Sequence, residues 1–278
     1  MRVKVRQMFA FVAVFSLGLI GVSACSSNGT DAAGVLKVGM ECAYAPFNWS
    51  QVDDANNAAE VDGGGYANGY DVRIAQRVAD KLGKKLVVVK TEWDGLLPAL
   101  TSGKIDLIIA GMSPTEERKE SIDFSEFYYS SKVVMVVKAD GKYPTATSIQ
   151  DFAGAKVTSQ LGITEYDMID QIKGVDKQPA LEDFPTMITA LKAGKIDGYV
   201  AEYPAAKSAI MANPDLAIVE FPEDKGFEFA LEKASTSIGV KKGETELLNA
   251  VNETLTGIFE AEREQLMSEA LAEQPVSE

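Results

Sequence analysis

The sequence has no histidine and only two cysteines among its 278 residues. The lack of histidine excludes a Ser/His/Asp triad, an HExxH zinc site and a histidine general base. Two cysteines cannot build a disulfide framework. Basic residues are also few, with 27 Lys and Arg against 41 Asp and Glu, so the net charge is −14. That balance argues against a nucleic-acid binder, which needs a basic surface, and we expect no nucleic-acid partner.

The rest of the composition is that of a folded protein. Hydrophobic residues make up 46% of the chain and charged residues 24%, which argues against wholesale disorder. At roughly 150 residues per domain, the length allows about two domains or lobes. No motif indicates a metal or a cofactor, and we expect neither.

The first 25 residues have the character of an export signal. Arg2, Lys4 and Arg6 form a basic start, and residues 8–22 then carry no charge. This apolar run is too short to cross a bilayer of about 30 Å and fits the core of a signal peptide. Residues 22–25, Val-Ser-Ala-Cys, resemble a bacterial lipobox. We therefore expect a signal peptide over 1–24, a lipid on Cys25 and a polar linker over 25–34; a plain secretory signal is the alternative.

The exported part of the chain would be strongly acidic. Without the leader, 24 basic and 41 acidic residues remain, a net charge of −17. This is either an ordinary solvated surface or a field that attracts cationic solutes. With Cys25 lipidated, Cys42 has no partner, and no histidine or adjacent basic residue activates it. We expect Cys42 to be a small buried residue and not a nucleophile.

Short apolar runs alternate with amphipathic segments along the chain. Ser148 and Asp151 have the spacing of a capping box before a short helix, whereas the polar, Gly-rich residues 50–68 indicate a loop. The alternation predicts an α/β protein with mainly parallel sheets, whose ligands bind at the carboxyl ends of the strands. Strands are expected over 35–40, 86–89, 105–110, 133–137 and 156–159, and helices over 72–82, 94–102 and 247–259.

Two segments of the chain are similar to each other. Residues 99–106 and 190–197 both read Ala-Leu, two variable residues, then Gly-Lys-Ile-Asp, at an offset of 91 residues. In both places a helical pattern precedes the motif and an apolar strand follows it. The motif is either one turn solution used twice or the mark of two similar lobes, each with its own sheet. In the second case the loops at 110–113 and 201–203 would face each other across a cleft.

Residues 113–118, Ser-Pro-Thr-Glu-Glu-Arg, directly follow a predicted strand. Ser113 or Thr115 can cap a helix, and the free N–H groups of a helix start attract anions. Arg118 can add a bidentate contact to a carboxylate. The alternative for Arg118 is a surface ion pair with a neighbouring acidic residue.

Glu41 and Tyr44 lie at the end of the first predicted strand, ahead of a turn at Pro46. An exposed Tyr44 can stack on a ligand or cover a cation, although loop packing explains it equally well. Trp93 also follows a strand, where ligands dock, but a single tryptophan more often belongs to a core.

The second half of the chain offers corresponding positions. Glu202 ends the strand after the second Gly-Lys-Ile-Asp, where a carboxylate is costly unless it meets a cation or contacts the hinge. The segment from Gln160 to Thr164 ends a strand and opens a helix, so its backbone N–H groups can form a second anion cradle.

An ordered set of motifs carries a family resemblance. Each motif is weak alone, but their order and spacing are specific. Over residues 35–270 the chain resembles the polar amino-acid solute-binding lipoproteins of ABC importers, bacterial extracellular solute-binding protein family 3. The motifs are Gly-Met-Glu at 39–41, Tyr-Ala-Pro-Phe at 44–47, Gly-Tyr-Asp-Val at 69–72, Trp-Asp-Gly-Leu-Leu-Pro-Ala-Leu at 93–100, Gly-Lys-Ile-Asp at 103–106, Ala-Gly-Met-Ser at 110–113 with Arg118, and Asp-Phe-Ser at 123–125.

The resemblance implies a bilobed α/β fold of the type II periplasmic-binding-protein kind, with two parallel-rich sheets joined by two hinge strands. Lobe 1 would comprise 35–133 plus 237–278 and lobe 2 138–232, with crossings near 134–137 and 233–236. It also implies a monomer, outside the cytoplasmic membrane, that closes on a free amino acid and delivers it to an ABC permease. No catalytic activity is implied.

The resemblance assigns residues to the two ends of an amino acid. Arg118 would hold the α-carboxylate with Ser113 and the turn around Thr164. Glu202 matches the acidic position that takes the α-ammonium, helped by the Gly111 carbonyl.

Four further positions match the surroundings of the side chain. Tyr44 and Trp93 would enclose it, Glu41 would meet a distal positive group, and Gln160 would lie nearby. Because Glu41 adds a negative charge beyond what a zwitterion needs, we predict a basic ligand: Arg, Lys, ornithine or His. Position 41 is also acidic in some glutamine binders, so glutamine and cystine are the alternatives.

Two other functions remain open at this point. Two carboxyl groups in a cleft also suit an enzyme of dehydratase type on the same fold, with Glu41 or Glu202 as general acid. A signalling or adhesion lipoprotein would use the cleft as a sensor or not at all.

Overall fold

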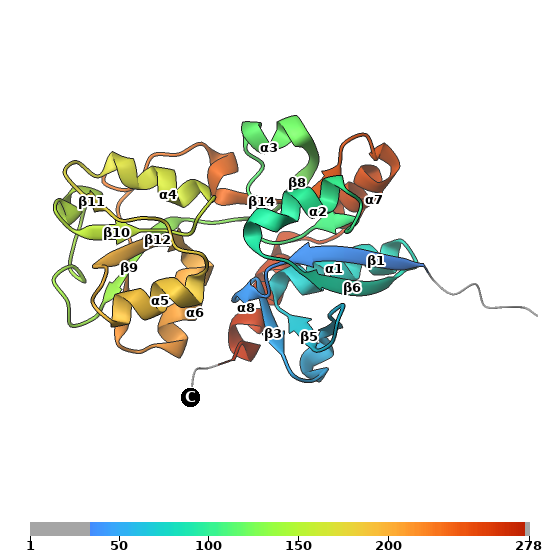
Figure 1. Cartoon of the computed structure of the whole chain (residues 1–278), viewed down its shortest axis with the longest axis horizontal. Coiled ribbons are helices and arrows are strands. Elements are labelled where there is room, and N and C mark those ends of the chain that lie inside the picture. Colours follow the sequence, from blue (N-terminus) through green and yellow to red (C-terminus); the bar gives the residue numbers. More distant parts are fainter. Residues whose placement is uncertain (1–33, 276–278) are drawn as a thin grey trace, which may run out of the picture. The chain divides into compact units, whose positions relative to one another are not determined.

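The computed structural model describes residues 34–275. The expected signal peptide over 1–24, the lipid site at Cys25 and all of the expected linker except Gly34 lie outside these residues. Within residues 34–275, no helix has both the length and the apolar character that crossing a membrane requires. This part of the chain is built on two five-stranded sheets and a smaller four-stranded one (Figure 1).

In the first sheet, three parallel strands are joined by a fourth that runs antiparallel to both of its neighbours. Helices α1 (Tyr70–Lys81), α2 (Leu96–Thr101) and α7 (Thr245–Thr256) contact β6, β1 and β8 of this sheet. We call the sheet and these helices the first lobe. In sheet order, the strands are β6 (Lys85–Lys90), β1 (Val35–Met40), β7 (Leu107–Ile108), β14 (Ser235–Lys241) and β8 (Ile122–Ser130).

The second sheet repeats this plan. Its first three strands are parallel, and β9 runs antiparallel to both of its neighbours. We call the sheet and its helices α4 (Thr164–Met168), α5 (Phe184–Lys192) and α6 (Tyr203–Ala212) the second lobe. In sheet order, the strands are β11 (Asp176–Lys177), β10 (Lys156–Thr158), β12 (Gly198–Glu202), β9 (Val133–Lys138) and β13 (Leu216–Val219).

The repeated Gly-Lys-Ile-Asp motif has the same role in both lobes. Asp106 accepts a hydrogen bond from the Lys37 N–H at 2.8 Å, and its own N–H donates to the Lys37 carbonyl at 2.8 Å. Asp197 makes the same two bonds, both at 2.8 Å, with Lys156. Each motif therefore ties the start of one strand to the start of a parallel neighbour. The structure therefore confirms the second interpretation of the motif, two similar lobes that each have their own sheet.

The chain crosses between the lobes at two adjacent places. β8 ends at Ser130 in the first sheet and β9 begins at Val133 in the second. On the return, the Ala234 carbonyl accepts a 2.9 Å hydrogen bond from the Ser131 N–H. The first crossing was expected at 134–137, with lobe 2 starting at 138, but β9 pairs with β12 and β13 along its whole length. An apolar run shows that a strand is buried and not which sheet it joins.

Residues 43–68, expected as loop from position 50 onward, contribute a small antiparallel sheet. Short stretches pair through the backbone here without a strong apolar pattern, so the loop prediction is wrong for much of this segment. The strand expected over 105–110 is shorter in the structure, because only β7 (Leu107–Ile108) pairs with β1. The small sheet has the order β2 (Ala43–Tyr44), β3 (Asn48–Gln51), β5 (Tyr66–Asn68) and β4 (Ala59–Glu60).

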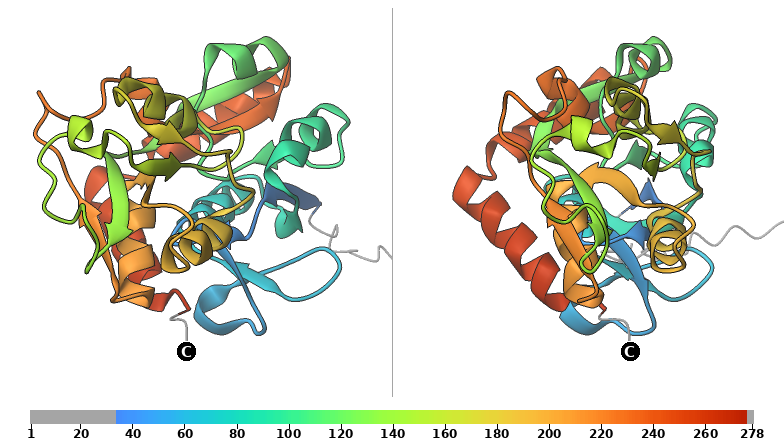
Figure 2. Two further views of the ribbon diagram at one scale, coloured as in Figure 1. Left: turned by 60° about the vertical axis from the view of Figure 1, so that its left-hand side comes forward. Right: turned by 90° about the vertical axis from the view of Figure 1, so that its left-hand side faces the viewer.

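The C-terminal helix expected over 247–259 is two helices. α7 ends at Thr256, and α8 (Glu260–Glu273) starts after Phe259, whose side chain is 75% exposed. α8 contacts α1 and also α6 of the second lobe, beside which it runs in Figure 2.

Short 3₁₀ turns complete the described chain. The one over Ile149–Phe152 begins with the expected capping box of Ser148 and Asp151. The helix over 72–82 and the strands over 35–40, 86–89, 133–137 and 156–159 are also confirmed. The remaining elements are α3 (Glu116–Ser121), η1 (Ala55–Asn57), η2 (Trp93–Gly95), η3 (Ile149–Phe152), η4 (Ile169–Gln171) and η5 (Leu231–Ala234).

Candidate functional site

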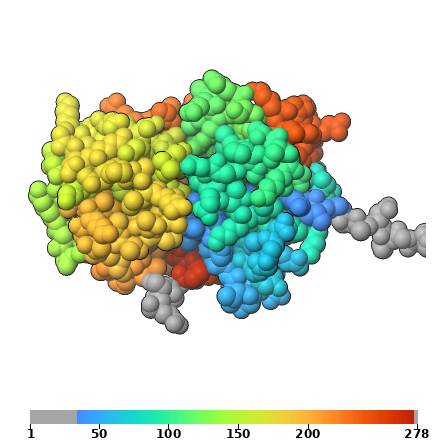
Figure 3. Space-filling view, in the orientation of Figure 1, coloured from blue at the N-terminus to red at the C-terminus, as the bar shows by residue number. Residues whose placement is uncertain are grey.

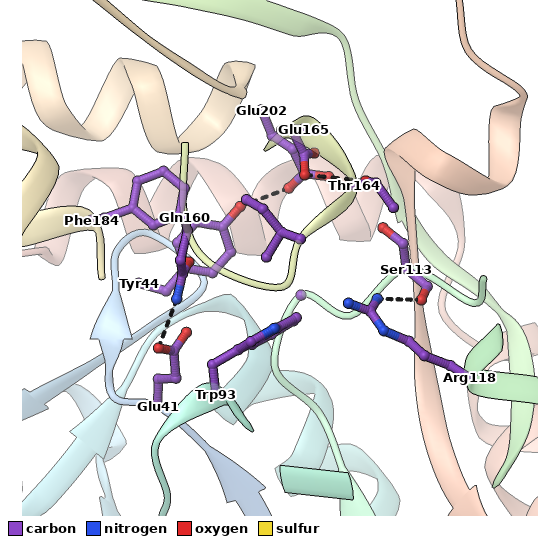
Figure 4. Close-up of a pocket in the computed structure, with 12 residues that line it drawn as sticks. Glu41, Tyr44, Trp93, Ser113, Arg118, Gln160, Thr164, Glu165, Phe184 and Glu202 are labelled. Carbon is purple, nitrogen blue, oxygen red and sulfur yellow. Dashed lines mark hydrogen bonds between the residues drawn. The ribbon is translucent and has the colours of Figure 1, made fainter. Parts of the chain in front are cut away.

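Residues from both lobes surround one cavity of about 330 Å³, its mouth included (Figure 4). All nine residues singled out from the sequence line it: Glu41, Tyr44, Trp93, Gly111, Ser113, Arg118, Gln160, Thr164 and Glu202. Three further residues line it that the sequence did not single out: Ile163, Glu165 and Phe184.

The cavity lies where strands of both sheets end. Glu41 follows β1 and Trp93 comes soon after β6, both in the first lobe. Gln160 follows β10, and Glu202 is the last residue of β12. In the space-filling view, the second-lobe surface around 160–195 meets the first-lobe surface around 90–105 (Figure 3). Carboxyl ends of parallel strands are where α/β folds place ligands.

Arg118 lies at one end of the cavity. Thr115 caps α3 by accepting from the Arg118 N–H at 3.3 Å. The guanidinium donates to the carbonyls of Ser113 at 2.7 Å and Gly162 at 2.8 Å, and it lies 5.2 Å from the centre of the Trp93 ring. Within residues 34–275 no carboxylate lies within 4.0 Å of it, so the predicted alternative of a surface ion pair is not formed. Burial lowers the pKa of Arg118.

Aromatic rings form the middle of the cavity. Tyr44 stacks on Phe47 with ring centres 4.9 Å apart and packs against Phe184 at 4.6 Å. Gly111 has a φ of +64°, and a Cβ there would lie 2.7 Å from the Tyr44 ring. Trp93 lies on the opposite side and donates from Nε1 to the Gly162 carbonyl at 3.3 Å. The middle of the cavity therefore suits the apolar part of a ligand.

Glu202 lies in the second-lobe wall and contacts the first lobe. It accepts a 2.8 Å hydrogen bond from the Tyr44 hydroxyl. Burial raises the pKa of Glu202 well above its ordinary value, the nearby Glu165 raises it further, and the bond from Tyr44 lowers it in part. Among residues 34–275 neither carboxyl group has a basic group within ion-pair distance, so both are costly to ionise and this wall favours a cation.

Glu41 lies at the end of the cavity away from Arg118, with Trp93 between them (Figure 4). Its Oε1 accepts a 2.9 Å hydrogen bond from Gln160 Nε2 of the second lobe. Burial raises the pKa of Glu41 to about 7, against the lowering effect of that bond. Near neutral pH a nearby cation can therefore shift Glu41 to its charged form.

A buried carboxyl group behind the cavity connects its two first-lobe turns. Asp71 accepts from Asn48 Nδ2 at 2.8 Å and from the Tyr128 hydroxyl at 2.7 Å. Asn48 in turn accepts from the Cys42 N–H at 2.7 Å, next to Glu41, and the Tyr128 hydroxyl accepts from the Gly111 N–H at 3.0 Å. Burial raises the pKa of Asp71 to about 6.

Cys42 is buried and free, as the sequence predicted. Burial raises the pKa of its thiol to about 12, so the thiolate that a nucleophile requires is absent at neutral pH. Among residues 34–275, no three acidic or cysteine side chains gather in a way that would hold a metal ion.

A sequence profile of the bacterial extracellular solute-binding proteins, family 3, matches residues 36–270. The chain belongs to this family. Members of the family are substrate-binding proteins and not enzymes, and they are extracytoplasmic. This solute-binding protein binds an amino acid for an ABC transporter. The dehydratase alternative is thereby excluded.

Relatives of this solute-binding protein cover most of its length. A protein of Campylobacter jejuni named "Probable histidine-binding protein" is 35% identical over 75% of this chain and 76% of its own. The L-cystine-binding protein TcyJ of Escherichia coli is 31% identical over 80% of this chain and 76% of its own. The L-arginine-bound structure of AbpA from Streptococcus pneumoniae has a TM-score of 0.74 and 32% identity, over 86% of this chain and 95% of that one.

The three unexpected cavity residues differ in how visible they are in the sequence. Ile163 lies within the segment 160–164 that the sequence indicated as an anion cradle, and Glu165 is the residue that follows this segment. Phe184 follows Asp183, which caps α5 by accepting from the Thr186 N–H at 2.8 Å. That pattern marks a helix start, but only the packing of α5 against Tyr44 brings the ring into the cavity of this solute-binding protein.

Proposed function

We propose that this protein captures a free cationic amino acid, of the Arg, Lys, ornithine or His class, and delivers it to an ABC importer. The single observation that carries the proposal is the position of Glu41. It lies at the far end of the cavity from Arg118, with aromatic rings between the two. A ligand with a carboxylate at one end and a cation at the other fits that arrangement.

Each part of such a ligand has a partner in the cavity. Its α-carboxylate would lie at Arg118, whose present acceptors are neutral backbone carbonyls. Its α-ammonium would lie at Glu202, and its side chain would run between Tyr44 and Trp93. The distal cation would then meet Glu41, which Gln160 holds at 2.9 Å.

The charge of the cavity supports a cation over a neutral ligand. Glu41, Glu165 and Glu202 face one guanidinium, that of Arg118. A zwitterion with a neutral side chain adds no net charge, whereas a basic amino acid adds one positive charge that offsets part of the excess. An acidic side chain would place like charges together in a buried site.

The names of the relatives agree with the cationic class in two cases out of three. The Campylobacter protein is named for histidine and the Streptococcus structure holds L-arginine, whereas TcyJ is named for cystine. Glutamine and cystine are accordingly the competitors in the test below.

A binding panel tests the proposal directly. Thermal shift and calorimetry with all twenty amino acids, ornithine and cystine should give the largest stabilisation with the basic ligands and none with glutamate. A ligand at 100 times its Kd stabilises by about 2.7 kcal/mol, which a thermal shift detects easily. A strong response to glutamate with none to arginine would refute the proposed ligand class.

Variants separate binding from folding. Arg118→Ala should abolish binding of every amino acid, because all of them carry the α-carboxylate. Arg77→Ala is a matched control, since Arg77 lies on α1 and pairs with Glu262 at 2.6 Å, away from the cavity. Normal binding by Arg118→Ala would place the carboxylate elsewhere.

We also propose that the lobes close on the ligand about the crossings at 131–132 and 233–234, and that a lipid on Cys25 tethers the monomer to the membrane. Hinge closure accounts for a cavity whose walls come from both lobes. The Cys25→Ser variant should leave the membrane fraction for the soluble fraction, and retention in the membrane would argue against the lipid.

A further inference from the structure

Glu165 is the one acidic residue of the cavity without a role in the ligand contacts proposed above. It is the second residue of α4, lines the cavity and is only 4% exposed. Figure 4 shows its carboxyl group beside that of Glu202. The two are close enough that the charge of Glu165 raises the pKa of Glu202.

The hydrogen bonds of Thr164 are compatible with two forms of Glu165, protonated and charged. The Thr164 hydroxyl lies 2.9 Å from the Lys233 carbonyl and 3.1 Å from Glu165 Oε2. A hydroxyl has one proton to donate, and a carbonyl can only accept. When Thr164 donates to Lys233, the contact with Glu165 needs a proton on the carboxyl group. When Thr164 donates to Glu165 instead, the bond favours the carboxylate, so the geometry accommodates both the protonated and the charged form of Glu165.

The surroundings of the pair contain little that would hold two negative charges. Three groups favour the charged form of Glu165: its own backbone N–H, the Thr164 hydroxyl, and Arg118 on α3, which lies beyond ion-pair distance. The other titratable groups that face the pair are acidic or phenolic: Tyr44 on β2, Asp71 on α1 and Tyr129 on β8. Two carboxyl groups in such a place share a proton rather than ionise together.

Resting on the proposed function, we propose that Glu165 and Glu202 form a carboxyl pair that exchanges its shared proton for the α-ammonium of the ligand. In the ligand-free form the pair holds one proton and one negative charge. When the ammonium enters, the proton leaves to solvent and the pair carries two negative charges against the incoming positive one. Capture of an amino acid is therefore accompanied by release of a proton, whatever the side chain of the ligand.

This coupling sets the direction of the pH dependence. Protons compete with the ammonium for the pair, so affinity rises with pH while the pair is protonated in the free protein. One proton released per ligand corresponds to about a tenfold rise in the association constant per pH unit. Glu41 adds a second dependence only for ligands with a distal cation, so L-glutamine and L-arginine report on different groups.

The experiment counts protons. Calorimetric titration of the wild-type protein with L-arginine and L-glutamine, in buffers of different ionisation enthalpy, should show about one proton released per bound ligand from the pair. Glu165→Gln should still bind, with about one proton fewer released and, for L-glutamine, a nearly flat pH profile, because Glu202 then has no second carboxyl group with which to share a proton. Asp167→Asn removes an exposed acid from the same helix and should match the wild type.

The outcomes separate this inference from the proposed function. If no amino acid in the panel binds, both fail. If amino acids bind but Glu165→Gln releases as many protons as the wild type, only the proton pair is refuted. If that variant does not fold, the wild-type count with L-glutamine decides alone, and release of fewer than about half a proton refutes the pair.

Discussion

The Tyr128 hydroxyl donates a 2.7 Å hydrogen bond to Asp71, 57 residues away in the sequence. The same hydroxyl accepts from the Gly111 N–H at 3.0 Å, so a buried acid holds a turn of the binding cavity through one phenol. Since Asp71 also holds Asn48, which accepts from the Cys42 N–H, both first-lobe turns of the cavity depend on it.

Tyr128→Phe should lower both stability and affinity. It removes both hydrogen bonds of the Tyr128 hydroxyl, the one to Asp71 and the one from the Gly111 N–H, and the loss of hydrogen bonds to a buried carboxyl group costs about 1–3 kcal/mol. Tyr70→Phe is the control, because the Tyr70 hydroxyl donates to the Tyr128 carbonyl at 2.9 Å and touches neither cavity turn. Thermal unfolding should show a loss in both variants, and calorimetry should show weaker ligand binding only in Tyr128→Phe.

Glu41→Gln should weaken basic ligands selectively. In the wild type, the pKa of Glu41 near 7 means that its carboxylate becomes available as the pH rises from about 6 to 8. The ratio of L-arginine affinity to L-glutamine affinity should therefore increase over this interval and should stay constant in the variant. An equal loss for both ligands would show that Glu41 is structural.

Trp93 should report ligand binding by its fluorescence. The protein has two tryptophans, and Trp49 is only 5% exposed and lies outside the cavity lining. Trp93 lines the cavity and contacts Arg118, so a ligand changes its surroundings. The emission change on adding L-arginine should persist in Trp49→Phe and disappear in Trp93→Phe. A change that survives in Trp93→Phe would contradict the proposed placement.

Gly111→Ala should reduce affinity through Tyr44. The added Cβ would lie 2.7 Å from the Tyr44 ring and displace it from its bond to Glu202. Gly194→Ala is a matched control, because its φ of +68° imposes similar backbone strain with nothing within 4 Å of the new atom. We expect a loss of at least about tenfold in affinity, or about 1.4 kcal/mol, in Gly111→Ala alone.

Most cavity residues could be predicted from the sequence because they lie at or just beyond the ends of strands. Glu41, Trp93, Gln160 and Glu202 all stand at or just beyond the end of an apolar run, and parallel sheets gather such positions. Their assignment to parts of a ligand came from the family resemblance and awaits the variants above.

Other features could not be predicted from the sequence because they depend on tertiary contacts. Phe184 enters the cavity only through the packing of α5 against Tyr44. β9 is apolar on both faces and gives no sign of its sheet, and the small sheet over 43–68 is held by backbone pairing between short strands. Ile258 is buried and continues the pattern of α7, although the helix has already ended.

The position of β14 has a consequence for how the molecule is assembled. The first sheet is made of strands from residues 35–130 joined by a strand from 235–241, whereas the second sheet uses only residues 133–219. Without β14, nothing would connect β8 to β7. The strands of the second sheet are thus contiguous in the sequence, whereas the first sheet is complete only when residues 235–241 have joined strands from residues 35–130.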